Sequence, residues 1–456
     1  DTYNTAVGYN AGLAVNSGSS NTLIGGLSGK AITTGTSNTM IGKEAGKALV
    51  DGDENVIIGD GAAQTTTAVH DAVIIGRGAA QNGAITTGAN GTVAIGHKAL
   101  EALTSGAKNT AVGYQAGKAM TDGTDCTILG YQAGLAMTGA NNNVAIGTDA
   151  LQSMVHGDNN TAVGLGALKQ ADEAGINRNT AVGHTAATNL TTAASTTAIG
   201  SRALGSGVVT GDNNTAVGES AGVAITSGAN NTLIGASTGQ SLTSGTSNTA
   251  IGINAMANFT VTGNSNTTVG NAAGYSITSG GNNLFLGNDS GRSGSPGGNI
   301  TTASNEIALG DENISEANIQ VDWTVASDQR DKTDFTSLDL GLDFVKGLAP
   351  VTYKWDKRSK YGDKMADDYD LNAQTPDGTH KEDWLDIGFK AQEVEALEKS
   401  AGYKIADKTN LTTSITGDGK QYGIQYSKFV PILVKAIQEL SSQVTELKKE
   451  IEELKN

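Results

Sequence analysis

The chain has 456 residues with 30 basic and 46 acidic side chains, which gives a formal net charge of −16. An acidic chain without a basic patch argues against binding of nucleic acid through phosphates. The single Cys126 excludes an internal disulfide framework. No run of about 20 apolar residues could cross a membrane as a helix. We therefore expect neither nucleic-acid binding nor membrane insertion.

Charge is distributed unevenly along the chain. The first 326 residues contain 33 charged side chains, whereas the last 130 contain 43. We therefore predict a repeat shaft over residues 1–310, a junction over 311–326 and a separate domain over 327–456. The sequence begins at Asp1 rather than Met, so we expect a further segment before it.

The first part is a repeat. An aliphatic residue followed by Gly occurs eighteen times, and twelve of the seventeen intervals are 17 residues long. Disorder does not explain a fixed period, and the Gly content excludes a long helix. The repeat glycines are Gly8, Gly25, Gly42, Gly59, Gly76, Gly96, Gly113, Gly130, Gly147, Gly164, Gly183, Gly200, Gly218, Gly235, Gly252, Gly270, Gly287 and Gly310.

Each position of the repeat has a physical interpretation. The aliphatic residue before the Gly is predicted to be a buried strand position, and the Gly to need positive φ or close backbone approach. Asn stands four before the Gly in thirteen copies, which predicts an Asn ladder. A second apolar pair, such as Ala31-Ile32, suggests a second short strand. We expect an all-β rod, a β-roll or β-helix on the order of 85 Å long at ~4.8 Å per rung.

A 17-residue rung almost without aromatic residues buries little surface alone, so three identical chains packed together would bury more. The repeat over 1–310 resembles the heads of trimeric bacterial adhesins and the shafts of bacteriophage tail fibres, which implies a homotrimer. Similar rungs pair out of step at little cost, and long-range β pairing is slow. Such a chain needs a device that sets its register.

The C-terminal part begins with Ser-Asp-x-Arg-x-Lys at 327–332. Four motifs come after it, at 348–355 (LAPVTYKW), 387–394 (IGFKAQEV), 422–426 (YGIQY) and 433–440 (LVKAIQEL). Together they resemble the intramolecular chaperone auto-processing domain of phage tail spikes and fibres. The resemblance implies a trimeric chaperone that templates the preceding β-structure and is released by autoproteolysis. It also implies a Ser/Lys dyad, whose matching positions are Ser327 and Lys332.

The chemistry of this dyad sets requirements. A Ser hydroxyl needs a base to take its proton, and Lys serves only when neutral, through burial or a nearby positive charge. Arg330 is the candidate for that charge, and Asp328 is a second supporting residue. Residues five apart do not face each other on a strand or a helix. We therefore expect an irregular backbone between Ser327 and Lys332 and hypothesise that assembly gates cleavage.

Two questions stay open at the cleavage site. We favour attack by Ser327 on its preceding carbonyl, which cuts Ala326–Ser327, over a cut between Ser327 and Asp328. In the alternative to cleavage, Ser327 caps a turn, Lys332 is a solvated charge, and nothing is cut. The chain is thus at most a single-turnover, self-cleaving serine peptidase.

A helix with a heptad seam is predicted over 430–456. An a/d pattern with Ile or Val at a and Leu at d by itself favours two strands, whereas the resemblance implies three. In a third possibility, one helix packs on its own domain. The seam residues are Val430, Leu433, Ile437, Leu440, Val444, Leu447, Ile451 and Leu454.

We expect no cofactor and no metal. The five histidines lack ligand spacing. The Asp- and Asn-rich turns at 51–54 and 157–160 suit solvated turns better than Ca²⁺ loops. Insertions near 77–92, 165–179 and 288–306 are expected to protrude from the shaft and to be the first places for a receptor contact.

These observations favour a homotrimeric phage tail-fibre protein for structure and host attachment. Its expected partners are a host surface receptor, a polysaccharide or outer-membrane component, and other tail proteins bound through the preceding segment. Its expected location is the virion, after synthesis in the host cytoplasm. The alternatives are a bacterial trimeric adhesin, against which the missing C-terminal membrane barrel stands, and a polysaccharide-degrading tail spike.

Overall fold

The computed structural model describes residues 2–171, 176–320, 323–364 and 368–455. The chain divides into two compact units. The first comprises Asp1–Asn288 and Thr301–Glu306, and the second comprises Asp289–Ile300 and Ile307–Asn456.

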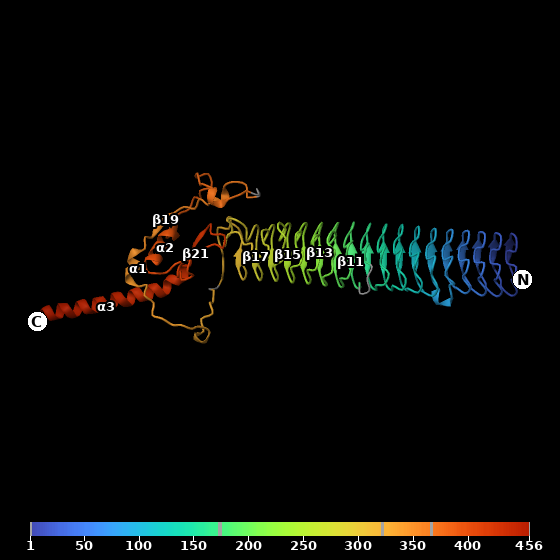
Figure 1. Ribbon diagram of the computed structural model, residues 1–456, viewed down its shortest axis with the longest axis horizontal. Coiled ribbons are helices and arrows are strands. Elements are labelled where there is room, and N and C mark those ends of the chain that lie inside the picture. The colour runs from blue at the N-terminus through green and yellow to red at the C-terminus, as the bar shows by residue number, and fades with distance from the viewer. Residues whose placement is uncertain (1, 172–175, 321–322, 365–367, 456) are drawn as a thin grey trace. The chain divides into compact units, whose positions relative to one another are not determined.

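The first unit is a parallel β-solenoid (Figure 1). Each turn contributes one three-residue strand, and consecutive strands pair in register, as where Thr215 lies opposite Thr232. One turn also holds the short helix η1 (Thr87–Ala89). The predicted all-β repeat is therefore confirmed. The strands are β1 (Thr5–Val7), β2 (Thr22–Ile24), β3 (Thr39–Ile41), β4 (Val56–Ile58), β5 (Val73–Ile75), β6 (Val93–Ile95), β7 (Thr110–Val112), β8 (Thr127–Leu129), β9 (Val144–Ile146), β10 (Thr161–Val163), β11 (Thr180–Val182), β12 (Thr197–Ile199), β13 (Thr215–Val217), β14 (Thr232–Ile234), β15 (Thr249–Ile251), β16 (Thr267–Val269) and β17 (Leu284–Leu286).

The predicted Asn ladder is present inside the solenoid. The Oδ1 atom of Asn231 accepts hydrogen bonds from the backbone N–H and the side-chain amide of Asn248, at 2.9 and 3.2 Å. Its own amide donates to Asn214 Oδ1 at 3.0 Å and to the carbonyl oxygen of Gly245 at 2.9 Å. These amides are buried, so each one pairs polar backbone groups that would otherwise be left unsatisfied.

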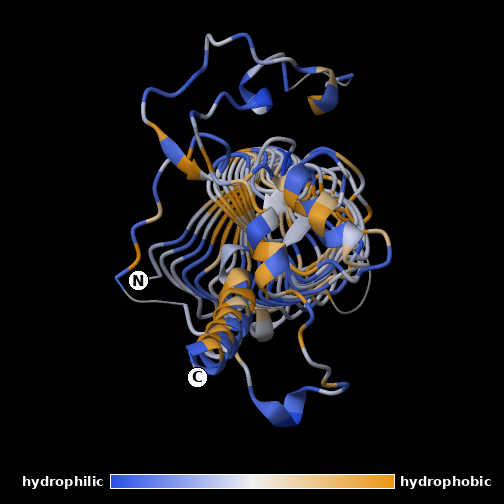
Figure 2. Cartoon of the chain, turned by 90° about the vertical axis from the view of Figure 1, so that its left-hand side faces the viewer, coloured by the Kyte–Doolittle hydropathy of each residue, from blue (hydrophilic) through white to orange (hydrophobic). Residues whose placement is uncertain are grey.

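The aliphatic residue before each repeat Gly does not face the interior, contrary to the prediction. In β14 the middle residue Leu233 is fully buried, whereas Ile234 is 40 % exposed. Successive side chains of a strand point to opposite faces, so only the middle residue of three enters the core. The outward aliphatic residues belong to strands that form a hydrophobic band in Figure 2.

The predicted second strand of each rung is also wrong. Ala31-Ile32 lies in a series of turns rather than in a strand, and Leu27 and Gly29 before it have φ of 64° and 53°. Backbone in the left-handed region cannot continue a strand. Ile32 is nevertheless fully buried. The second apolar pair therefore supplies core volume, and its pairing between rungs is limited to single contacts, such as the parallel bridges of Leu190 with Val209 and Leu242 with Val261.

Cys126 takes the place of an Asn in the ladder. Its backbone N–H donates to Asn109 Oδ1 at 3.0 Å, and its Sγ lies 3.2 Å from the carbonyl oxygen of Ala140. Burial raises the pKa of this thiol.

The insertions are only partly described. The one near 77–92 contains η1, whereas the one near 165–179 includes residues 172–175, which lie outside the described residues. Of the insertion near 288–306, residues Asp289–Ile300 belong to the second unit.

The repeat Gly is required where successive turns approach most closely. Gly25 has φ of +128°, and a Cβ atom added there would overlap the carbonyl oxygen of Gly42 on the next rung. Its neighbour Gly26 has no atom within 4 Å of the corresponding position. The same turn therefore contains one position that excludes a side chain, Gly25, next to one that has room for it, Gly26.

We expect Gly25→Ala to destabilise the solenoid by roughly 3 kcal/mol or more, because the positive φ and the overlap both oppose a side chain. Gly26→Ala should change stability by less than about 1 kcal/mol. Thermal unfolding followed by far-UV circular dichroism compares the two. Equal melting temperatures would contradict the close approach of the turns.

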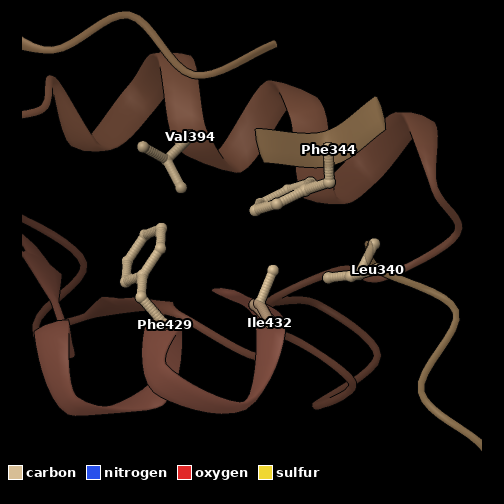
Figure 3. Packing of buried hydrophobic residues seen from close by; sticks show 5 residues of the cluster. All are labelled: Leu340, Phe344, Val394, Phe429 and Ile432. Atoms are coloured by element: carbon tan, nitrogen blue, oxygen red, sulfur yellow. The ribbon is translucent and has the colours of Figure 1, made fainter. Parts of the chain in front are cut away.

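The second unit is α+β, as predicted. Two pairs of its strands are antiparallel, β19 with β20 and β21 with β22, whereas β18 is a strand of the 18-stranded sheet. Figure 3 shows its core, in which Leu340, Phe344, Val394, Phe429 and Ile432 converge. The elements are β18 (Ile307–Leu309), η2 (Gln329–Asp331), α1 (Leu342–Gly347), β19 (Val351–Tyr353), η3 (Arg358–Lys360), η4 (Leu371–Ala373), β20 (Asp386–Gly388), α2 (Ala391–Ser400), β21 (Thr413–Ile415), β22 (Tyr422–Ile424), η5 (Tyr426–Lys428) and α3 (Phe429–Lys455).

The C-terminal helix α3 has two apolar faces. Phe429, Ile432 and Ala436 are buried in the domain core, whereas the heptad residues remain exposed, with Ile437 at 66 % and Leu447 at 55 %. The helix thus packs on its own domain with one face and leaves the heptad seam uncovered. None of the described helices is long and apolar enough to span a bilayer.

A buried carboxylate joins α2 to the β21–β22 hairpin. Glu398 is fully buried and accepts hydrogen bonds from the backbone and hydroxyl groups of Thr412 and Thr413. Burial alone raises the pKa of Glu398, but the hydrogen bonds from Thr413 and Thr412 outweigh it, so the pKa lies below the usual range.

We expect Glu398→Gln to lower the free energy of unfolding of the second unit by about 1–3 kcal/mol at neutral pH, because an amide cannot accept all these bonds. Since the folded pKa is depressed, this stabilisation is present above about pH 4.3, the unfolded value, and is lost as pH falls through the folded pKa. The difference between variant and wild type should therefore shrink in acid.

Trp fluorescence during urea unfolding measures this effect, because Trp323, Trp355 and Trp384 all lie in the second unit. Glu393→Gln on the exposed surface of α2 is the control. A difference that stays the same between pH 7 and pH 3 would contradict an ionised Glu398.

Candidate functional site

The segment Ser327–Lys332 is bent by a single 3₁₀ turn. Asp328 is the N-cap of η2, and its carboxylate accepts the backbone N–H of Arg330 at 2.9 Å. Lys332 ends the turn by donating its backbone N–H to the carbonyl of Gln329. This is the irregular backbone that a five-residue separation requires, since η2 interrupts extended backbone at Asp328 and Lys332.

The turn brings the two predicted dyad residues together. Lys332 Nζ lies 2.5 Å from Ser327 Oγ and 3.3 Å from the Ser327 carbonyl oxygen. A neutral amine at this distance is able to accept the hydroxyl proton, and an ammonium there donates to the oxygen. The geometry of a nucleophile and its base is therefore present within one chain.

Arg330 does not contact Lys332. Its guanidinium binds the Asp328 carboxylate, with Nη2–Oδ2 at 2.6 Å and Nε–Oδ1 at 3.1 Å. This hydrogen bonding lowers the pKa of Asp328 and raises that of Arg330. The positive charge expected to make Lys332 neutral is thus paired with a carboxylate, so Arg330 and Asp328 hold the turn.

The dyad of the single chain is open to solvent. Ser327 and Lys332 are both exposed. Large apolar side chains next to the site in sequence are also exposed in the single chain. Trp323, Val325 and Phe335 are all more than half exposed. Sequence reasoning missed this flanking set, although Trp323 is the first Trp of a chain that has only three.

Carboxylates elsewhere serve structural contacts. Asp53 accepts from the backbone N–H of Thr36 at 2.7 Å, and Asp158 from that of Asn141 at 2.7 Å, each on the preceding rung. Among the described residues, no group of three or more His, Cys, Asp or Glu side chains is placed to hold a metal ion. A cavity of about 820 Å³ in the second unit includes no dyad residue in its lining.

Comparison with protein families identifies the region that begins at the dyad. The Peptidase_S74 family model, described as the chaperone of endosialidase, matches residues 327–403. The match starts at Ser327 and covers the turn, α1, β19, β20 and α2. No curated protein and no solved structure matches the chain.

Proposed function

We propose that this chain is a homotrimeric bacteriophage tail-fibre component whose C-terminal domain assembles the β-solenoid and then cuts itself free beside Ser327. The observation that carries the proposal is the 2.5 Å contact between Lys332 Nζ and Ser327 Oγ. It stands at the first residue of the match to the chaperone of endosialidase.

The solenoid explains why a chaperone would be needed. Its strands repeat nearly the same three residues, so a rung paired one step out of register keeps most of its contacts. Parallel pairing over 17 residues is also slow relative to local structure. A domain that joins three chains at one end would fix which rung of each chain faces which.

In the proposed cleavage, Ser327 is the nucleophile and Lys332 is the base. Lys332, as the free amine, takes the proton of Ser327 Oγ while the oxygen attacks the carbonyl carbon of Ala326. Lys332 then gives this proton to the amide nitrogen as the C–N bond breaks, so the nitrogen leaves as the new amino terminus of Ser327 and an ester joins Ala326 to Oγ. Water then hydrolyses the ester and restores the hydroxyl. Attack on the preceding carbonyl closes a five-membered ring, whereas attack on the carbonyl of Ser327 itself would close a strained four-membered ring.

Assembly of the chains would bury the dyad, which the reaction requires. Burial is one of the two effects that make a Lys amine neutral, and the exposed Trp323, Val325 and Phe335 are the surfaces that neighbouring chains would cover. In this mechanism the dyad stays inactive in the single chain and becomes active in the trimer. Only chains that have assembled into a trimer would then be cleaved.

Denaturing mass spectrometry of the expressed chain tests the cleavage. Wild type is expected to give two fragments divided at Ala326–Ser327, and Ser327→Ala to stay whole. Lys332→Ala should slow cutting by roughly 10²–10⁴, the usual contribution of a general base. The control is Lys346→Ala, which removes an exposed Lys from α1 and should cut normally. A wild-type trimer whose chains are all uncleaved would contradict the proposal of autoproteolysis.

Two uncovered apolar stripes support assembly with further copies of the chain, and the number three comes from the family resemblance. The outward residues of the shaft strands, such as Leu129 and Ile234, and the heptad seam of α3 are both partly exposed in the single chain. Further copies of the chain would bury both stripes, which gives hydrophobic stabilisation in proportion to the area.

Native mass spectrometry should therefore give three times the 46.1 kDa chain mass for uncleaved Ser327→Ala. Leu447→Lys should dissociate that trimer or weaken it by at least about tenfold, because three charges would meet in the seam. Ser442→Lys, on the outer face of the same helix, should leave it intact. A dimer or monomer in the parent protein would contradict the trimer.

Host attachment is the proposed role of the mature shaft. The insertions near 77–92 and 165–179 interrupt the regular rung, and loops of this kind vary without disturbing the ladder. The insertion near 288–306 is less suited to this role while the C-terminal domain is attached, because residues 289–300 belong to the second unit. A surface polysaccharide or an outer-membrane component is the proposed receptor, and the virion is the proposed location.

A further inference from the structure

The compact unit that contains the matched domain extends across the proposed cut. Residues 289–300 and 307–326 precede Ser327 in sequence, yet they cluster with residues 327–456 rather than with the solenoid. We infer that cleavage beside Ser327 leaves the C-terminal fragment bound, without a covalent link, to the chain segment that precedes the cut. This inference rests on the proposed cleavage and concerns the fate of the two fragments.

Glu312 is the main charged contact across the cut. Its side chain is 4 % exposed and its carboxylate pairs with Lys364. Its backbone carbonyl accepts a hydrogen bond from Lys357 Nζ at 2.7 Å. Both lysines lie after the cut, and Glu312 lies before it. Separation of the fragments would leave these charged groups to be solvated again, and removal of one partner would leave a buried charge unpaired.

Lys357 is itself held in place by a residue of the C-terminal fragment. Its Nζ atom lies 3.5 Å from a carboxylate oxygen of Glu382, which Lys360 approaches at 3.9 Å. The ammonium group is therefore oriented before it meets the Glu312 carbonyl. Burial lowers the pKa of Lys364, and the nearby Asp289 and Asp311 carboxylates act in the opposite direction. Carboxylates from before the cut thus surround an amine from after it.

Backbone packing forms a second contact. A Cβ atom on Gly294 would lie 2.5 Å from Ser359 Cβ, and one on Gly298 would lie 2.8 Å from Thr416 Cβ. The backbone N–H of Asn299 donates to Asp418 Oδ2 at 3.1 Å. Ile300 and Ser359 are buried here. The loop 289–300 therefore lies directly against two separate segments of the C-terminal fragment, which resists dissociation more than a single contact would.

Because of these contacts, cleavage of the chain and release of the C-terminal fragment are two separate events. Hydrolysis removes the covalent link at an exposed position, far in sequence from Glu312 and Gly294. The noncovalent contacts are untouched by the chemistry. Cleavage makes the domain releasable, and release is a later step whose rate the contacts of Glu312 and of loop 289–300 determine.

The test uses full-length Ser327→Ala with a site-specific protease sequence inserted between Glu316 and Ala317, in an exposed stretch. After protease treatment, denaturing electrophoresis confirms the cut and size-exclusion chromatography shows whether the fragments travel together. Co-elution is expected. Lys357→Ala combined with Lys364→Ala should accelerate separation by roughly tenfold or more, and Glu312→Gln, which keeps the side-chain shape, should act in the same direction.

Lys449→Ala removes an exposed Lys from the outer surface of α3 and should not change the separation rate. Immediate separation of the parent fragments would overturn the inference, as would co-elution that neither the double Lys variant nor Glu312→Gln weakens. Because the added protease makes the cut, this result is independent of self-cleavage. An uncut wild type together with co-eluting protease fragments would refute autoproteolysis and leave the retained contact standing.

Discussion

The hydrogen bond from one Asn side chain to the next rung is the constraint on which the shaft depends. Where Asn stands at the same point of successive turns, its side chain reaches both the neighbouring backbone and the neighbouring amide and so aligns one rung with the next. It also makes every rung nearly equivalent to the next. The same interaction that stabilises the solenoid thus leaves its register poorly specified, and a long stack of such rungs favours a separate assembly domain.

The sequence predicted those parts of the fold that depend on local periodicity. The repeat, the Asn ladder and the terminal helix each follow from residue types at fixed spacing. The outward orientation of Ile234 could not be predicted from the sequence, because a strand of three residues is too short for alternation to show which side is the interior. The apolar pair Ala31-Ile32 predicts a strand, because apolar residues suit strands. The turns there depend on positive φ values at residues such as Leu27, and the residue type Leu does not predict a positive φ.

At the site, sequence reasoning identified two residues that the structure brings together, but not their surroundings. The meeting of Ser327 and Lys332 required only that the backbone between them be irregular, and Asp328 provides this by capping the turn. The sequence did not predict that Arg330 pairs with Asp328, because each is interpreted there as a separate supporting residue of the dyad. The contacts of Glu312 join segments about 50 residues apart, which no local motif reveals.

The buried thiol of the shaft has a use beyond packing. Cys126 lies inside the solenoid with a raised pKa, and it is the sole cysteine of the chain. A thiol-labelling reagent reacts with the thiolate, so it gains access only when that rung opens. The labelling rate of the native protein would report local opening in the middle of the stack, at a single position and without any introduced probe. In the proposed trimer, a labelling rate lower than that of the free chain would show that neighbouring subunits slow the opening of a rung far from either end.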